Sequence, residues 1–139
     1  MRKKRGFTLI ELLAVITILA IILLVVVPSA LKSYDNSKKN LYDIMIKNIC
    51  YSSNSYYEEF QAGIIEVKDE NKETITKLEK INIADLQKKD YLDKDLINPI
   101  TGKEIGSSKV EITVSEENNS VDFYVTIDGN TKKCSEMNK

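Results

Sequence analysis

The feature that most constrains this chain is a run of 20 residues without a charge, from Leu12 to Leu31. An α-helix rises 1.5 Å per residue, so the run would form a helix of about 30 Å, the thickness of a bilayer's hydrocarbon core. Four basic residues, Arg2 to Arg5, precede it. By the positive-inside rule they hold the N-terminus in the cytoplasm. The sequence therefore predicts one membrane-spanning helix, with everything after Lys32 outside the cytoplasm.

Composition removes several classes of function. The 139 residues suffice for one globular domain, and they include no His, no Trp and only two Cys. This inventory excludes the usual zinc spacings, a C-x-x-C redox pair and a Cys-His or Ser-His nucleophile. Without the four N-terminal basic residues, 16 basic side chains face 21 acidic ones. We therefore expect no enzyme and no cofactor, and nucleic acid is not predicted as the main partner.

One acidic residue, Glu11, stands at the head of the apolar run. A carboxylate inside a bilayer costs about 2.5 kcal/mol or more, so such a group usually has a partner and a purpose. The segment Thr8-Leu9-Ile10-Glu11 matches a T-x-x-E capping box, in which Glu11 satisfies free N–H groups at the start of the helix. An amine of opposite charge is the other candidate partner, and both readings can hold at once.

The apolar run itself allows more than one fate. Small residues from Val27 to Ala30 would offer a cleavage site to a signal peptidase, but a signal peptide's apolar region is only about 7 to 15 residues long. A plain uncleaved anchor is a further alternative. Either fate would leave a monomeric membrane-anchored or secreted binding domain, in which Glu11 is only a cap.

A third fate follows from the boundary between the basic and the apolar segments. The sequence K-R-G-F-T-L-I-E-L-L and the apolar run behind it resemble the class III signal of type IV pilins and pseudopilins. The resemblance covers residues 1–30 and implies that a membrane aspartyl prepilin peptidase cuts between Gly6 and Phe7. It also implies methylation of the new Phe7 amine and pairing of Glu11 with the Phe7 amine of a neighbouring subunit. A charge pair tolerates burial better than a lone charge, so this contact would set the axial register.

The same resemblance implies an organisation and a set of partners. Residues 1–6 would be a cleaved leader, residues 7–31 a transmembrane and filament-core helix, and residues 32–139 an extracytoplasmic head. Pro28 would loosen the helix as it packs, through a kink or a melted stretch. The partners would be other pilin subunits, the prepilin peptidase, the cytoplasmic membrane and the assembly machinery. Such a structural subunit would leave the membrane for a surface filament that serves adhesion and motility, DNA uptake or secretion, and the sequence does not choose among these roles.

The head should have an α+β, pilin-like fold. We expect the helix to continue to about residue 60 and to bury one stripe against a small antiparallel sheet. The predicted stripe consists of Leu41, Met45, Ile49, Tyr56 and Phe60, and the tyrosines at 42, 51, 56 and 57 should lie in the core or at its edge. Alternating apolar residues at 109–115 and 121–128 predict a β-hairpin.

The middle of the chain is expected to be less regular. The charged residues 68–80 predict a solvated connection, Asn82 caps a short helix to about Lys89, and turns follow at Asn98-Pro99 and Thr101-Gly102. Residues 90–103 resemble the loop before the sheet in Gram-positive pilin-like proteins. Oxygens of Asp93, Asp95 and Asn98 could bind calcium, but the D-x-D-x-D-G pattern is incomplete, which favours a solvated acidic loop.

The two cysteines, Cys50 and Cys134, both fall in the predicted extracytoplasmic part. An even number of cysteines outside the cytoplasm favours a disulfide, which here would tie the end of the chain to the long helix. Two free, buried thiols are the alternative. The arrangement departs from pilins whose paired cysteines both lie near the C-terminus.

Overall fold

The structure is a computed structural model that describes residues 5–107 and 110–138. The first four residues of the predicted leader and Lys109 of the predicted hairpin lie outside this description. The elements, in chain order, are helix α1 Leu9–Gln61, strand β1 Lys80–Ile81, helix α2 Ile83–Lys88, 3-10 turn η1 Ile105–Ser107, strands β2 Val110–Glu117, β3 Ser120–Ile127 and β4 Asn130–Lys133, and 3-10 turn η2 Cys134–Asn138. The chain divides between Ser37 and Lys38 into two compact units, which are described separately.

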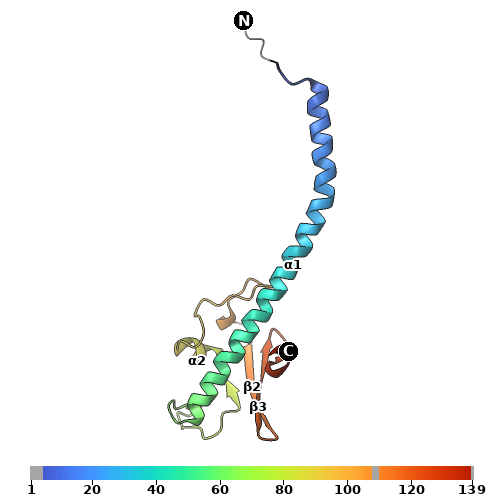
Figure 1. Cartoon of the computed structure of the whole chain (residues 1–139). Helices are drawn as coiled ribbons and strands as arrows, with labels where there is room; N and C mark the ends of the chain where they lie inside the picture. Colours follow the sequence, from blue (N-terminus) through green and yellow to red (C-terminus); the bar gives the residue numbers. More distant parts are fainter. Residues whose placement is uncertain (1–4, 108–109, 139) are drawn as a thin grey trace. The chain divides into compact units, whose positions relative to one another are not determined.

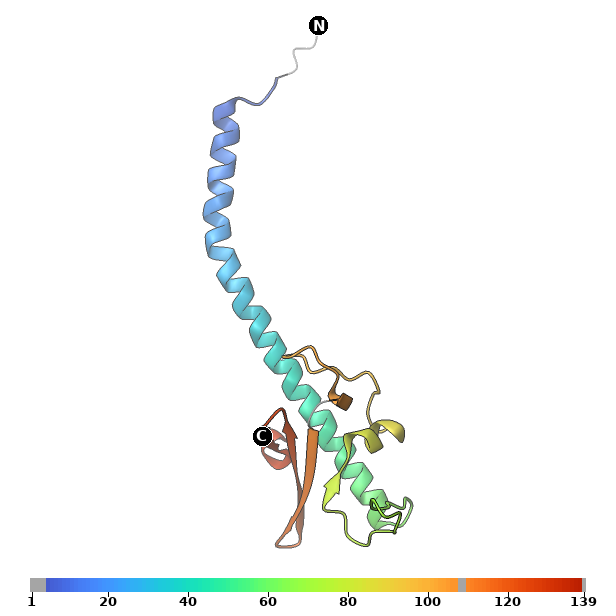
Figure 2. The ribbon, with the colours of Figure 1, turned by 180° about the vertical axis from the view of Figure 1, so that it is seen from behind.

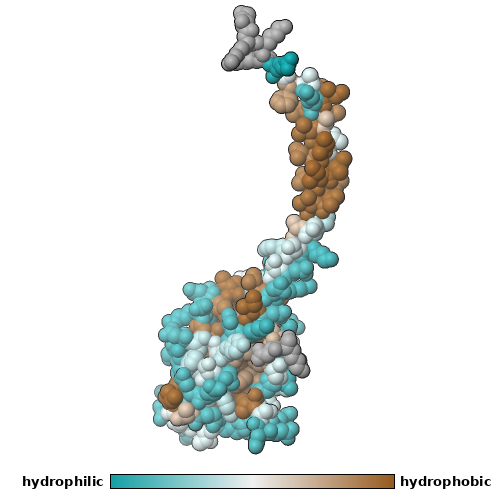
Figure 3. Space-filling model, in the orientation of Figure 1, coloured by the Kyte–Doolittle hydropathy of each residue, from teal (hydrophilic) through white to brown (hydrophobic). Residues whose placement is uncertain are grey.

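The first unit consists of the N-terminal segment and the apolar part of α1. Residues 9–31 are all exposed within the single chain, and Figure 3 shows most of this part of the helix as hydrophobic surface. Among the described residues, α1 is the helix long and apolar enough to cross a membrane. The helix runs through Pro28 without a break, so the melted stretch that we considered there is absent from this structure.

The second unit packs the C-terminal part of α1 against the strands, as Figures 1 and 2 show. One face of the helix is buried and consists of Tyr42, Met45, Ile46, Ile49, Ser52, Ser53, Tyr56 and Tyr57. Two residues of the predicted core are instead exposed: Leu41 by 54% and Tyr51 by 64%. At about 100° per residue, Tyr51 points away from the buried face and Leu41 lies roughly a quarter turn from its centre.

A backbone motif ends α1 where the sequence places Ala62 and Gly63. Gly63 has a φ of 72°, in the left-handed region that glycine adopts without a steric penalty. The N–H of Ile64 donates to the carbonyl of Glu59 at 2.9 Å, and that of Gly63 donates to Phe60 at 3.1 Å. These two bonds form a Schellman motif, which satisfies carbonyls that the helix end leaves free.

The four strands form one antiparallel sheet in the order β1-β2-β3-β4. The predicted hairpin is present as β2 and β3, with Glu117 paired to Ser120 around Asn118-Asn119. Both asparagines have positive φ angles, 51° and 63°. A two-residue turn of this type matches the right-handed twist of the strands, and asparagine tolerates the left-handed conformation better than most residues.

The core lies between the sheet and α1, and it confirms the α+β, pilin-like fold. Alternate residues of β3, Phe123, Val125 and Ile127, are buried, while Val121 beside the turn of the hairpin is 40% exposed. The charged connection at 68–80 is less solvated than predicted, because Leu78 is buried and the segment ends in β1. Strands β1 and β4 both add to the predicted hairpin.

Candidate processing and assembly site

The peptide bond between Gly6 and Phe7 lies in a short non-helical segment just before α1. Arg5, Gly6 and Thr8 are exposed, and the side chain of Phe7 is 88% exposed. A Cβ built on Gly6 would meet no atom within 4 Å in the described chain. The fold therefore neither covers this bond nor needs a glycine beside it, which leaves the bond open to an enzyme.

Glu11 lies in the first turn of α1 and makes a reciprocal capping box with Thr8. The N–H of Thr8 donates to Oε2 of Glu11 at 3.0 Å, and the N–H of Glu11 donates to Oγ1 of Thr8 at 3.3 Å. Both donors belong to the helix start, where backbone N–H groups have no partner inside the helix. The box turns the carboxylate of Glu11 back toward the residue that follows Phe7.

This geometry makes the two roles of Glu11 compatible. A carboxylate has two oxygens and about four acceptor positions, so one N–H bond at Oε2 leaves acceptor capacity free. The carboxylate also lies at the N-terminal, positive end of the helix dipole. The capping box therefore presents a charged group near the predicted new N-terminus.

The apolar surface of α1 begins beside this carboxylate. Residues 12–31 carry no charge and are exposed, so the described chain provides no cover for them. The hydroxyl of Thr17 donates to the carbonyl of Leu13 at 2.6 Å, which satisfies it within the helix. Pro28 has no N–H, so α1 lacks one helical hydrogen bond there. A bilayer, or the helices of other subunits, could cover such a surface.

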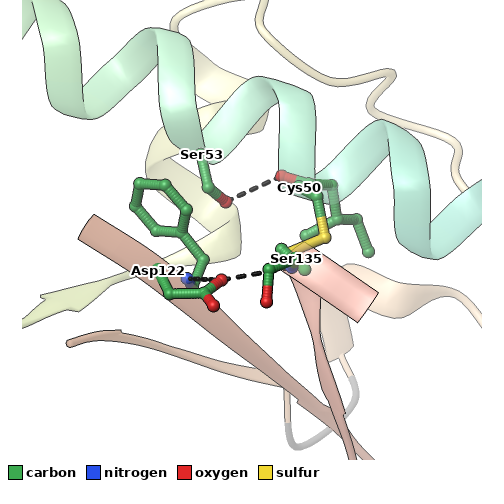
Figure 4. The surroundings of a disulfide bond; sticks show 7 residues. Cys50, Ser53, Asp122 and Ser135 are labelled. Atoms are coloured by element: carbon green, nitrogen blue, oxygen red, sulfur yellow. Dashed lines mark hydrogen bonds between the residues drawn. A yellow bond between two sulfur atoms is a disulfide. The ribbon is translucent and has the colours of Figure 1, made fainter. Parts of the chain in front are cut away.

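The remaining candidate residues belong to the second unit. The structure joins Cys50 of α1 to Cys134 of η2 by a disulfide, with 5.7 Å between the Cα atoms (Figure 4). Asp93 and Asp95 are exposed, whereas Asn98 is buried and its Oδ1 accepts the N–H of Ile100 at 2.9 Å. Among the described residues, no group of three or more Asp, Glu, His or Cys is placed to hold a metal ion.

Sequence reasoning overlooked several polar contacts that fix the second unit. Tyr91 donates to Glu59 of α1, and Tyr57 donates to Oε1 of Glu116 on β2 at 2.7 Å. The amide of Gln87 donates to the carbonyl of Asp93 at 3.0 Å. The two tyrosine contacts join residues far apart in the chain, so no local sequence pattern could have indicated them.

The exposed Gly-Phe bond, the capped Glu11 and the uncovered apolar helix follow one another at the start of the described chain. In the comparison with protein families, residues 1–27 match the prokaryotic N-terminal methylation motif. This class III prepilin signal supports the type IV pilin and pseudopilin family and a pilin-like processed subunit. No curated protein and no solved structure matches the chain.

Proposed function

We propose that this chain is a structural subunit of a type IV pilus-like filament. Residues 1–6 are a leader, residues 7–31 are the membrane and filament-core helix, and residues 32–139 are an extracytoplasmic head. The methylation motif at residues 1–27 supports processing by a prepilin peptidase and anchoring in the membrane before assembly. The filament serves adhesion and motility, DNA uptake or secretion.

The observation that carries the proposal is the arrangement at the start of α1. Four residues separate an exposed Gly6-Phe7 bond from Glu11 in its capping box, and an uncovered apolar helix follows directly. Cleavage there removes the basic leader and leaves the whole apolar segment on the product. A signal peptidase cut near Ala30 would discard that segment instead.

Assembly then uses the two ends of the processed segment. Cleavage gives Phe7 an α-amine with a reference pKa of about 8, so the amine is mostly protonated near neutral pH. The carboxylate of Glu11 in an incoming subunit forms an ion pair with the Phe7 amine of its neighbour, and the two charges neutralise each other as the helices pack. Pro28, which lacks one helical hydrogen bond, is the position at which the helix loosens during packing.

The mature N-terminus tests this proposal. Mass spectrometry of the protein from native membranes distinguishes chains that start at Met1, Phe7 or Ala30. We expect a start at Phe7 with one added methyl group. A Met1 start would indicate a plain anchor, and an Ala30 start a secreted domain, and either result would overturn the proposal.

A further inference from the structure

The end of strand β4 brings Cys134 to Cys50 through a change of backbone path. Strand β3 pairs Tyr124 with Lys133, the last residue of β4. Continued in the same register, the ladder would place Cys134 opposite Phe123 and Ser135 opposite Asp122. The chain instead turns into η2 at Cys134. Something must therefore hold the chain at this turn, because the ladder stops one residue before the cysteine.

The carboxylate of Asp122 holds the residues on both sides of Cys134. Its Oδ1 accepts the N–H of Ser135 at 3.2 Å, and its Oδ2 lies 3.5 Å from Nζ of Lys133. The same Oδ1 accepts the N–H of Phe123 at 2.9 Å, which fixes the rotamer of Asp122. Figure 4 shows Asp122 and Ser135 beside the disulfide. One side chain thus ties the turn to β3 immediately before and after the cysteine.

Two features make this contact stronger than an ordinary surface ion pair. The side chain of Asp122 is only 19% exposed, so water screens its interactions less. Hydrogen bonds to a charged acceptor are also stronger than those between neutral groups. By contrast, the pair between Lys132 and Asp43, which ties β4 to α1, has both side chains more than 40% exposed. Asp122 is therefore the better anchor of the two.

We propose that Asp122 is a positioning residue for the disulfide, and that it seats Cys134 beside Cys50 before the bond forms. Cys134 is buried to 8% exposure and must meet a residue 84 positions earlier in the chain. Oxidation consumes one oxidised thiol compound, such as oxidised glutathione. A thiolate of one cysteine attacks it and releases one glutathione, and the second thiolate then attacks the mixed disulfide and releases the other. The two thiol protons are balanced by the two glutathione thiols produced.

The first test measures how readily the two thiols pair. The full chain in detergent micelles is equilibrated with reduced and oxidised glutathione, and the oxidised fraction gives the effective concentration of Cys50 toward Cys134. We expect Asp122→Ala to lower this concentration about tenfold, the loss of one charge-assisted hydrogen bond. Asp122→Asn, which keeps an acceptor but loses the charge, should have a smaller effect.

A core variant separates positioning from general stability. Val125 is fully buried on the same strand, two residues beyond Phe123, so Val125→Ala weakens the fold but leaves in place Asp122 and the groups that it holds. While this variant remains folded, its effective thiol concentration should equal that of the unchanged chain. An unchanged value for Asp122→Ala, or an equal loss for Val125→Ala, would overturn the proposal.

A second measurement does not depend on the fully reduced chain. In a Cys50→Ser chain, Cys134 has no sulfur partner, and its alkylation by iodoacetamide reports whether the turn still buries it. We expect slow alkylation when Asp122 is present and a rate about tenfold higher when Asp122→Ala is added. Equal rates in the two chains would show that Asp122 does not seat the cysteine.

Discussion

At the residue scale, Gly6 illustrates a requirement that lies outside the chain's own fold. The open space around Gly6 means that a larger side chain would disturb no packing in the described chain. Its φ is also not in the left-handed region, since the glycines with positive φ are Gly63, Gly102 and Gly129. Any demand for a small residue at position 6 must therefore come from outside the fold, and in our proposal it comes from the peptidase.

We predict that Gly6→Val blocks processing and leaves the basic leader on a protein that stays in the membrane. The reason is the size limit at the scissile bond, since the fold itself tolerates the change. Immunoblotting of membrane fractions would show the longer, unprocessed form. The free energy of unfolding of the head should not change, and normal maturation of Gly6→Val would remove the main support for cleavage at this bond.

A second residue-scale effect concerns Tyr91. The hydrogen bond that Tyr91 donates to Glu59 raises the pKa of its phenol to about 12, and burial and the charge of Glu59 act in the same direction. The neutral phenol is thus favoured in the folded state. Its contribution to stability is complete below about pH 10, the pKa of an unfolded tyrosine, and is lost as the pH rises toward 12.

Tyr91→Phe tests this contact. We predict that the variant loses about 1 kcal/mol of unfolding free energy near neutral pH, the net value of one such hydrogen bond. The tyrosine absorbance titration should also lose its phase near pH 12. Tyr51→Phe is the matched control, because Tyr51 is exposed on the other face of α1. Equal stability losses for the two variants would contradict the assignment.

At the scale of elements, the sequence predicted α1 well but misplaced part of its buried face. A 3.6-residue period and the glycine at position 63 define the helix and its end by local rules. The predicted stripe placed a residue every four positions, at Leu41, Met45 and Ile49. Four residues rotate the side-chain direction around the helix axis by roughly 40° more than a full turn, so such a stripe drifts around the helix. The sheet instead covers a face that alternates steps of three and four, which places Tyr42 and Ile46 inside.

Ile46 and Ile44 provide a direct test of this face. Ile46 is fully buried, whereas Ile44, the same residue type two positions earlier, is 53% exposed. Ile46→Ala should lower the unfolding free energy by about 2 to 5 kcal/mol, because it leaves a cavity in the core. Ile44→Ala should change it by no more than about 0.5 kcal/mol. Urea unfolding of both variants measures the difference, and similar losses would contradict the observed orientation.

The strands show why some elements escape sequence analysis. Strands β2 and β3 have eight residues each, so their alternation is visible in the sequence. Strand β1 has two residues and β4 has four, Asn130 to Lys133, without a large apolar side chain. These short strands form because a neighbouring strand offers free backbone groups, a cause that depends on tertiary structure and leaves little trace in composition.

At the scale of the whole molecule, the cysteine pair links the long helix α1 to the C-terminal end of the second unit. We predict that non-reducing peptide mapping of the protein from native membranes recovers Cys50 and Cys134 in one linked pair. Closing a loop of 84 residues contributes about 4.5 kcal/mol in the chain-entropy model, so a Cys50→Ser, Cys134→Ser chain should unfold at lower denaturant concentration. Recovery of both thiols in alkylated form would reject the bond.

The sequence identified the candidate site almost completely, because its parts lie next to one another. Gly6, Phe7 and Glu11 fall within six residues, and the apolar run begins directly after them. The structure confirms the capping box that the T-x-x-E pattern predicts, which shows that Glu11 has a role in the isolated chain as well as a proposed one in the filament. These two roles make different demands on the side chain. A helix cap needs only a hydrogen-bond acceptor, whereas a side chain that pairs with an amine also needs a negative charge.

Two substitutions at Glu11 separate these demands. Glutamine is also found at this position of capping boxes, so Glu11→Gln retains the cap and removes the charge. Glu11→Ala removes both. Loss of the cap alone would cost about 1 kcal/mol in the first turn of the helix, whereas an unpaired buried amine would cost several kcal/mol in the filament.

The most direct measurement is the yield of sheared surface filaments from cells that carry each variant as their only copy. Membrane levels are matched to those of the unchanged protein, and both variants should be processed at Gly6. We predict that Glu11→Ala and Glu11→Gln both fail or lag in entering filaments, because neither can neutralise the Phe7 amine of a neighbour. Filament yield equal to that of the unchanged protein in Glu11→Gln would contradict charge pairing and leave Glu11 as a helix cap.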